Sequence, residues 1–94
     1  MLKLQDIEKA VRDVGGSYGV KRVQLFGSYA EGRATPASDV DLIVEFDKPS
    51  VSLFTLNGLR LDLEERLGRS VDVIHGPLNP DAMIAPRRTM SIYG

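Results

Sequence analysis

The segment VDLIVEF, residues 40–46, constrains the fold of this 94-residue chain more than any other stretch. Its β-branched and apolar residues are typical of a central strand that is covered on at least one face. A chain of this length buries only about 60 to 65% of its unfolded surface on folding, so it builds one small core. We therefore expect residues 1–94 to form a single domain around a sheet that contains this strand.

The N-terminal part of the chain predicts a helix followed by a strand. Apolar residues recur at helical spacing and are followed by Gly15 and Gly16, which predicts an amphipathic helix over residues 3–14. The apolar residues of this stripe are Leu4, Ile7, Val11 and Val14. The segment KRVQLFG then predicts a short strand that ends at Gly27, followed by a helical turn over residues 28–32 and a loop.

The C-terminal half predicts a long helix, a third strand and a short tail. Spaced leucines predict a helix over residues 52–67, with Glu64, Glu65 and Arg66 toward solvent, although Gly58 could delay its start or bend it. The leucines of this stripe are those at positions 53, 56, 59, 63 and 67. RSVDVIHG predicts the third strand, and residues 80–92 a weak helix broken at Pro86. Such an order of elements predicts an α+β fold, a small mixed β-sheet packed on one face by helices.

Apolar residues near the end of the chain also require an explanation. Met83, Ile84, Met90 and Ile92 are more apolar surface than a frayed tail needs. We expect them to dock on the core or on a partner.

Charge and composition exclude several classes of protein. The net charge is −1, with 12 Lys and Arg against 13 Asp and Glu, so we expect neither direct nucleic-acid binding nor attraction to an anionic membrane. The absence of cysteine excludes disulfides and thiolate metal sites. No apolar run is long enough for a signal peptide or a membrane-spanning helix, so we expect a cytoplasmic protein.

Two acidic residues lie at the start of the central strand. Alternation along a strand places Asp39 and Asp41 on the same side, about 6 to 7 Å apart at their Cα atoms. Asp72 alternates with Val71 and Val73 in the third strand and would join them if the two strands are neighbours. Carboxylates at this spacing repel each other unless a cation lies between them, and Mg²⁺ prefers such oxygen ligands. The pattern predicts that Asp39, Asp41 and Asp72 bind one or two Mg²⁺ ions and catalyse phosphoryl or nucleotidyl transfer.

Gly27 and Ser28 predict a phosphate-binding turn. A glycine at a strand end, followed by the first turn of a helix, lets backbone N–H groups approach an anion closely. Ser28 adds a hydroxyl donor, and Gly32 permits the tight loop that brings the strand with Asp39 alongside. In isolation, each of these features is an ordinary cap or strand residue, and only the combination indicates a site.

That combination resembles a known enzyme family. GSYAEGRATPASDVDL, residues 27–42, is similar to the Gly-Ser, ten-residue gap and Asp-x-Asp signature of the polymerase-β-like nucleotidyltransferases, and GRSVDVI resembles the later motif of its minimal members. The resemblance implies that Gly27 and Ser28 bind the nucleotide phosphates, that Asp39 and Asp41 bind metal, and that Asp72 is the third carboxylate. Arg33 and Ser38 are further nucleotide-binding candidates in the same loop.

The resemblance also implies a partner. Minimal members of the family are commonly antitoxins of HEPN-domain ribonuclease toxins, and some transfer AMP from ATP to a toxin tyrosine. Many relatives carry two arginines in the loop where this chain has Tyr29 and Glu31. These two residues favour an alternative to the transferase, a binding module that neutralises the toxin by occlusion. An aminoglycoside-type nucleotidyltransferase, whose small cationic substrate the acidic cluster could attract, also stays open.

Overall fold

A computed structural model describes residues 2–48, 50–77 and 88–94 of the chain. The elements in chain order are α1 (Leu4–Gly15), the 3₁₀ turn η1 (Gly16–Tyr18), β1 (Val20–Phe26), β2 (Val40–Phe46), α2 (Leu53–Leu67), β3 (Val71–His75) and β4 (Met90–Tyr93). None of the helices formed by the described residues is long and apolar enough to cross a lipid bilayer.

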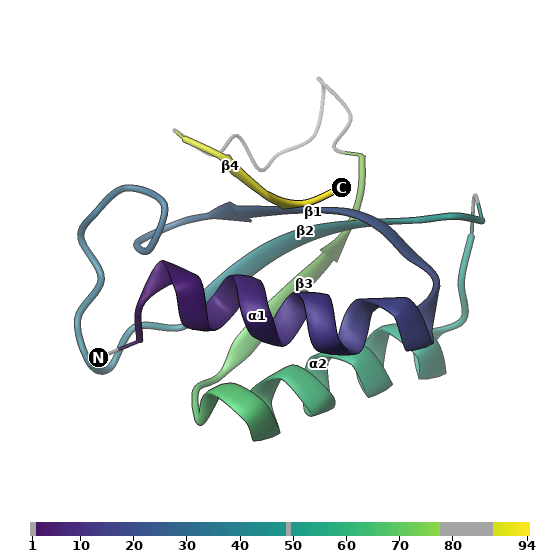
Figure 1. The fold of residues 1–94 in the computed structure, drawn as a ribbon, viewed down its shortest axis with the longest axis horizontal. Helices are drawn as coiled ribbons and strands as arrows, with labels where there is room; N and C mark the ends of the chain where they lie inside the picture. The colour runs from purple at the N-terminus through teal and green to yellow at the C-terminus, as the bar shows by residue number, and fades with distance from the viewer. Residues whose placement is uncertain (1, 49, 78–87) are drawn as a thin grey trace.

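The strands of the described residues form one mixed sheet in the order β3-β2-β1-β4. β1 is antiparallel to β2 and β4, whereas β3 is parallel to β2 because α2 carries the chain back between them. Both helices lie against the same face of this sheet (Figure 1). The predicted α+β fold, with helices on one face of a small mixed sheet, is confirmed.

The core lies between this sheet face and the helices. β2 is central, and its residues Val40, Leu42 and Val44 point toward the helices with no exposed surface. Side chains alternate along a strand, so Asp41 and Glu45 project from the opposite face. Alternation in the most buried strand therefore places Asp41 outside the helix-facing core.

α1 and α2 begin and end close to the predicted positions. The Asp6 carboxylate accepts the Lys3 N–H at 3.0 Å before α1, and the Ser52 hydroxyl accepts the Thr55 N–H at 3.2 Å before α2. Gly68 ends α2 in the left-handed region, and its N–H donates to the Glu64 carbonyl at 2.8 Å. The stripe prediction is wrong at its first position, because Leu53 is 81% exposed and only the later leucines face the core.

Gly58 does not delay the start of α2, which is one continuous helix over Leu53–Leu67. A Cβ at this position would lie 3.1 Å from Cε1 of Tyr18, whose hydroxyl donates to the Asp62 carboxylate one turn further along α2. The glycine therefore makes room for an aromatic ring that joins η1 to α2.

The predicted C-terminal helix is wrong where the structure describes it. Residues 90–93 form strand β4, which pairs with β1 and places Met90 opposite Leu25; residues 80–87 of that prediction lie outside the described residues. Pairing with the open edge of β1 outweighs a weak local helix preference. The expectation that the apolar tail docks is confirmed for Met90 and Ile92, which pack against the core.

Candidate active site

Two of the predicted acids lie side by side on the face of the sheet away from the helices. Asp41 and Asp72 are direct partners in the parallel β2–β3 register, so their side chains project on the same side. The pKa of Asp41 is raised to about 6, first by burial and then by a hydrogen bond with Asp72 and by the negative charges of Asp72 and Asp39. The register therefore places two carboxylates close together on this face of the sheet.

Asp39 lies at the margin of this pair. It is exposed, directly before β2, and close enough for its charge to raise the pKa of Asp41. Within the described ranges, no three Asp, Glu, His or Cys side chains are grouped closely enough to form a metal cluster. The structure thus brings Asp41 and Asp72 together and leaves Asp39 beside them.

The Asp41–Asp72 pair has the chemistry of a divalent-metal ligand set. Its donors are hard carboxylate oxygens on a partly exposed sheet face, which is the ligand type that Mg²⁺ prefers. Burial, and after it the neighbouring carboxylates, raises the pKa of Asp41, and a bound cation would oppose this shift by favouring the charged carboxylate. The residues present therefore fit a magnesium ion.

Gly27 packs directly against Asp41. Its φ is +74°, and a Cβ at this position would lie 2.2 Å from Oδ2 of Asp41. Both the left-handed backbone and the lack of a side chain are needed for the end of β1 to approach the carboxylate. The predicted phosphate-binding glycine and the predicted metal ligand are therefore in contact.

Residues after Gly27 form the predicted helical turn. The Glu31 N–H donates to the Gly27 carbonyl at 3.0 Å, and the Arg33 N–H donates to the Ser28 carbonyl at 2.9 Å, with Gly32 at φ +72° closing the turn. The N–H groups of Ser28, Tyr29 and Ala30 donate to no described residue. Such N–H groups at the start of a turn are suited to an anion.

The other two candidate residues of the loop make local contacts. Arg33 donates from Nε and Nη2 to Oε1 of Glu31, at 3.0 Å in each case, so the Glu31 carboxylate faces the Arg33 guanidinium. The Ser38 hydroxyl accepts the Thr35 N–H at 2.8 Å and stabilises the bend before β2. The contacts of Ser38 in the structure are those of a turn residue.

Tyr29, which stands where many relatives have arginine, belongs to the core. It is 6% exposed, and its hydroxyl has no hydrogen-bond partner among the described residues. Tyr29 therefore contributes packing under the turn, where an arginine would contribute charge.

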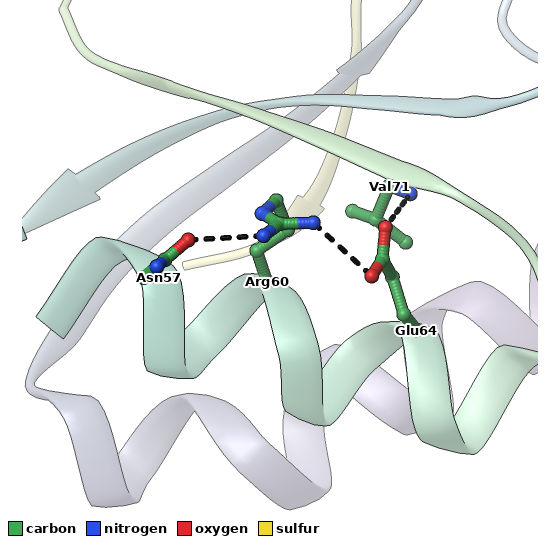
Figure 2. A network of polar contacts seen from close by, with 4 residues as sticks. All are labelled: Asn57, Arg60, Glu64 and Val71. Atoms are coloured by element: carbon green, nitrogen blue, oxygen red, sulfur yellow. Dashed lines mark hydrogen bonds and ion pairs between the residues drawn. The ribbon is translucent and has the colours of Figure 1, made fainter. Parts of the chain in front are cut away.

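Glu64 is a residue near the site whose contact the sequence did not indicate. Its predicted exposure is wrong, because the carboxylate accepts the Val71 N–H at 2.9 Å and Nη1 of Arg60 at 3.1 Å. Arg60 also donates from Nη2 to Asn57 at 3.0 Å, as Figure 2 shows. The available signal was its position, one turn before the Gly68 helix end and close to the strand that carries Asp72.

The described residues form a four-stranded mixed sheet with two helices on one face, which is the architecture of the nucleotidyltransferase fold. Residues 4–92 match the nucleotidyltransferase domain family, so the chain belongs to this family and is a nucleotidyltransferase. The family resemblance in the sequence is thereby confirmed.

The chain is also similar to particular proteins and solved structures. The protein adenylyltransferase MntA of Thermococcus cleftensis is 37% identical over 79 residues, which cover 79% of this chain and 78% of that protein. A crystal structure of a toxin-antitoxin with AMP-PNP has a TM-score of 0.75 at 22% identity and covers 99% of this chain and 74% of that one. The structure of a tri-AMPylated Shewanella oneidensis HEPN toxin in complex with MNT antitoxin has a TM-score of 0.67 at 18% identity, with coverage of 96% and 71%. These two structures share the fold of this chain.

Proposed function

We propose that this chain transfers AMP from ATP to a hydroxyl, a tyrosine in our assignment, of a HEPN-domain toxin and thereby acts as an antitoxin. The proposal is supported by the 37% identity to the adenylyltransferase MntA and by the likeness in fold to toxin-antitoxin complexes. It takes residues 1–94 as one catalytic domain and places the acceptor hydroxyl on the toxin.

The proposed reaction uses the residues that the fold brings together. The hydroxyl oxygen bonds to the α-phosphorus of ATP while the bond from that phosphorus to the bridging oxygen of the β-phosphate breaks. Pyrophosphate leaves, and the hydroxyl proton passes to Asp72, the exposed member of the carboxylate pair. The N–H groups that follow Gly27 orient the phosphates, with Ser28, Ser38 and Arg33 as further nucleotide-binding residues.

Asp39, Asp41 and Asp72 are the proposed ligands of one or two Mg²⁺ ions. When bound, Mg²⁺ supplies positive charge against the triphosphate and against the charge that develops during transfer. The chain's own contribution is to hold the carboxylates on adjacent strands, where the Asp41–Asp72 register sets their spacing.

The single observation that carries the proposal is the contact of Gly27 with Asp41, directly opposite Asp72. Intact mass spectrometry of a HEPN-type partner after incubation with this chain, ATP and Mg²⁺ tests it. We expect the partner to gain one or more AMP units, and to gain none with the Asp39→Ala/Asp41→Ala variant. A stable complex without any adduct would reject the transferase.

A second candidate function is neutralisation by occlusion without transfer. It is favoured by the burial of Tyr29 and by the pairing of Arg33 with Glu31, which reduce the free positive charge at the turn. The same variant separates the two functions in a cell-growth assay with the toxin. An occluding antitoxin still neutralises after loss of both aspartates, whereas a transferase that retains only binding does not.

A further inference from the structure

The start of β3 is held from two sides. On one side, the Val40 N–H of β2 donates to the Ser70 carbonyl at 2.9 Å, immediately before β3. On the other side, the carboxylate Oε2 of Glu64 accepts the Val71 N–H at 2.9 Å. Since Asp72 is the next residue, these two hydrogen bonds fix the backbone that carries its carboxylate.

Glu64 satisfies a backbone donor that has no access to water. Val71 is 1% exposed, and within the described sheet β3 pairs on only one side, with β2. A buried N–H without an acceptor costs about 1 to 3 kcal/mol, so the Glu64 carboxylate is a required part of this strand start. The Glu64 carbonyl also accepts the Gly68 N–H at 2.8 Å, so one residue sets both ends of the α2–β3 connection.

Glu64 is itself held by its neighbours on α2. Arg60 donates from Nη1 to Oε1 of Glu64, which leaves Oε2 for Val71, and Asn57 accepts from the other end of the same guanidinium (Figure 2). The Glu64 side chain is 26% exposed, so its orientation is set largely by protein contacts. These three side chains form a chain of hydrogen bonds from the surface of α2 to the strand of the site.

We propose that Glu64 is a positioning residue that fixes Asp72 beside Asp41 for metal–nucleotide binding. The inference rests on the proposed function, in which Asp72 is a ligand. Groups that orient metal ligands commonly change affinity or activity by about 10- to 100-fold when they are removed. Glu64 acts one residue away, through the backbone of Val71, so the effect should lie at the lower end of this range.

A set of variants separates the Val71 contact from the rest of the network. Glu64→Ala removes both hydrogen bonds of the Glu64 carboxylate, and Glu64→Gln keeps an oxygen acceptor for Val71. Arg60→Met removes the hydrogen bonds of Arg60 to Glu64 and Asn57 and leaves the Val71 contact. Glu65→Ala, at the exposed neighbouring position, is the matched control. Amide hydrogen exchange of Val71, followed by NMR, reports the contact directly. We expect faster exchange in Glu64→Ala alone.

The functional readout is the affinity of each folded variant for Mn²⁺·ATP, measured by calorimetry well below its melting temperature. We expect Glu64→Ala to weaken binding about tenfold and Glu64→Gln to retain most of it. In an Asp72→Asn background, Glu64→Ala should have little further effect, because Glu64 acts through Asp72.

Two results would overturn this role. The first is a wild-type affinity of Glu64→Ala for Mn²⁺·ATP despite fast exchange of the Val71 amide. The second is an equal loss of affinity on Glu64→Ala in the wild type and in the Asp72→Asn background, because a residue that only stabilises the fold would behave in this way. A wild-type chain that does not bind Mn²⁺·ATP at all would instead overturn the proposed function, and with it the ligand role of Asp72.

Discussion

At the scale of single residues, the site depends on a glycine at position 27, beside Asp41. Gly27 and Gly32 have similar positive φ angles, +74° and +72°, but only at Gly27 would a Cβ meet another atom, Oδ2 of Asp41 at 2.2 Å. Both alanine variants therefore adopt an unfavourable left-handed backbone, at about 1 to 2 kcal/mol each, and only Gly27→Ala also displaces the carboxylate. We expect Gly32→Ala to keep nucleotide binding and Gly27→Ala to lose it and to be less stable by a further 1 kcal/mol or more, roughly.

Urea unfolding and Mn²⁺·ATP calorimetry on this pair of variants measure both effects. Equal stability losses with equal affinities would show that Asp41 moves aside without consequence.

Asp41 also predicts how stability depends on pH. Its pKa in the fold is about 6, above the 3.8 of a free aspartate, so the folded state binds the proton more tightly than the unfolded state does. The charged form therefore destabilises the fold above about pH 6, and this penalty disappears as the pH falls from 7.5 through 6 toward 4. Because Asp41 is partly exposed, the gain should be only on the order of 1 kcal/mol, or a few degrees in Tm.

Melting curves of the wild type and Asp41→Asn between pH 7.5 and 5 test this prediction. The variant should melt higher than the wild type at pH 7.5 and keep only part of this advantage at pH 5, whereas Glu65→Gln should follow the wild type. Added Mg²⁺ should raise the wild-type Tm at pH 7.5 and leave Asp41→Asn unchanged. A wild-type Tm that falls on acidification over this range, relative to Asp41→Asn, would contradict the sign.

At the scale of elements, the packing of η1 against α2 depends on Gly58, a glycine in the interior of the helix. Alanine normally stabilises a helix interior relative to glycine by about 1 kcal/mol, but at position 58 its Cβ would lie 3.1 Å from the Tyr18 ring. We expect Gly58→Ala to be neutral or destabilising in the wild type and stabilising by about 1 kcal/mol in a Tyr18→Ala background. Thermal unfolding of the wild type, Gly58→Ala, Tyr18→Ala and the double variant measures the effect of Gly58→Ala on stability in both backgrounds. Stabilisation in both backgrounds would mean that Tyr18 moves without cost.

The elements that the sequence predicted correctly are those with a strong local pattern. The periodic apolar stripe of α1, the Ser52 and Gly68 ends of α2, and the β-branched run of β2 each carry their own signal. β4 does not, because Met90–Tyr93 becomes a strand only by pairing with β1, a partner more than 60 residues earlier in the chain. The sequence predicts Glu64 in solvent for the same reason, since its role as an acceptor depends on where the fold places Val71.

At the scale of the whole molecule, some features of the candidate site follow from a local sequence pattern and others only from the fold. The Asp-x-Asp pattern predicted one face for Asp39 and Asp41, but the direct pairing of Asp41 with Asp72 required the β2–β3 register, which no local pattern encodes. The pairing of Glu31 with Arg33 and the burial of Tyr29 likewise follow from the folded turn. Sequence spacing therefore indicates which residues form a site, and topology decides which of them are in contact.

The topology also places the site at one end of the molecule. β1 returns after α1 and η1, so the start of α1, the end of β1 and the start of β2 share the end that carries Gly27 and Asp39 (Figure 1). The C-terminus follows β4, which runs antiparallel to β1, and Gly94 lies beside Lys21 at the opposite end. Under the proposed function, a protein acceptor therefore approaches the end where α1 begins.

A folded protein fused without a linker at the N-terminus should hinder this approach, whereas the same protein fused after Gly94 should not. We expect the N-terminal fusion to slow AMP transfer to a protein acceptor about tenfold or more, equivalent to about 1.4 kcal/mol of lost productive encounter. Mn²⁺·ATP affinity should stay at the wild-type value in both fusions, because a small ligand still reaches the carboxylates. Transfer kinetics and calorimetry on the two fusions test this, and equal transfer rates would mean that the acceptor approaches from another side of the sheet.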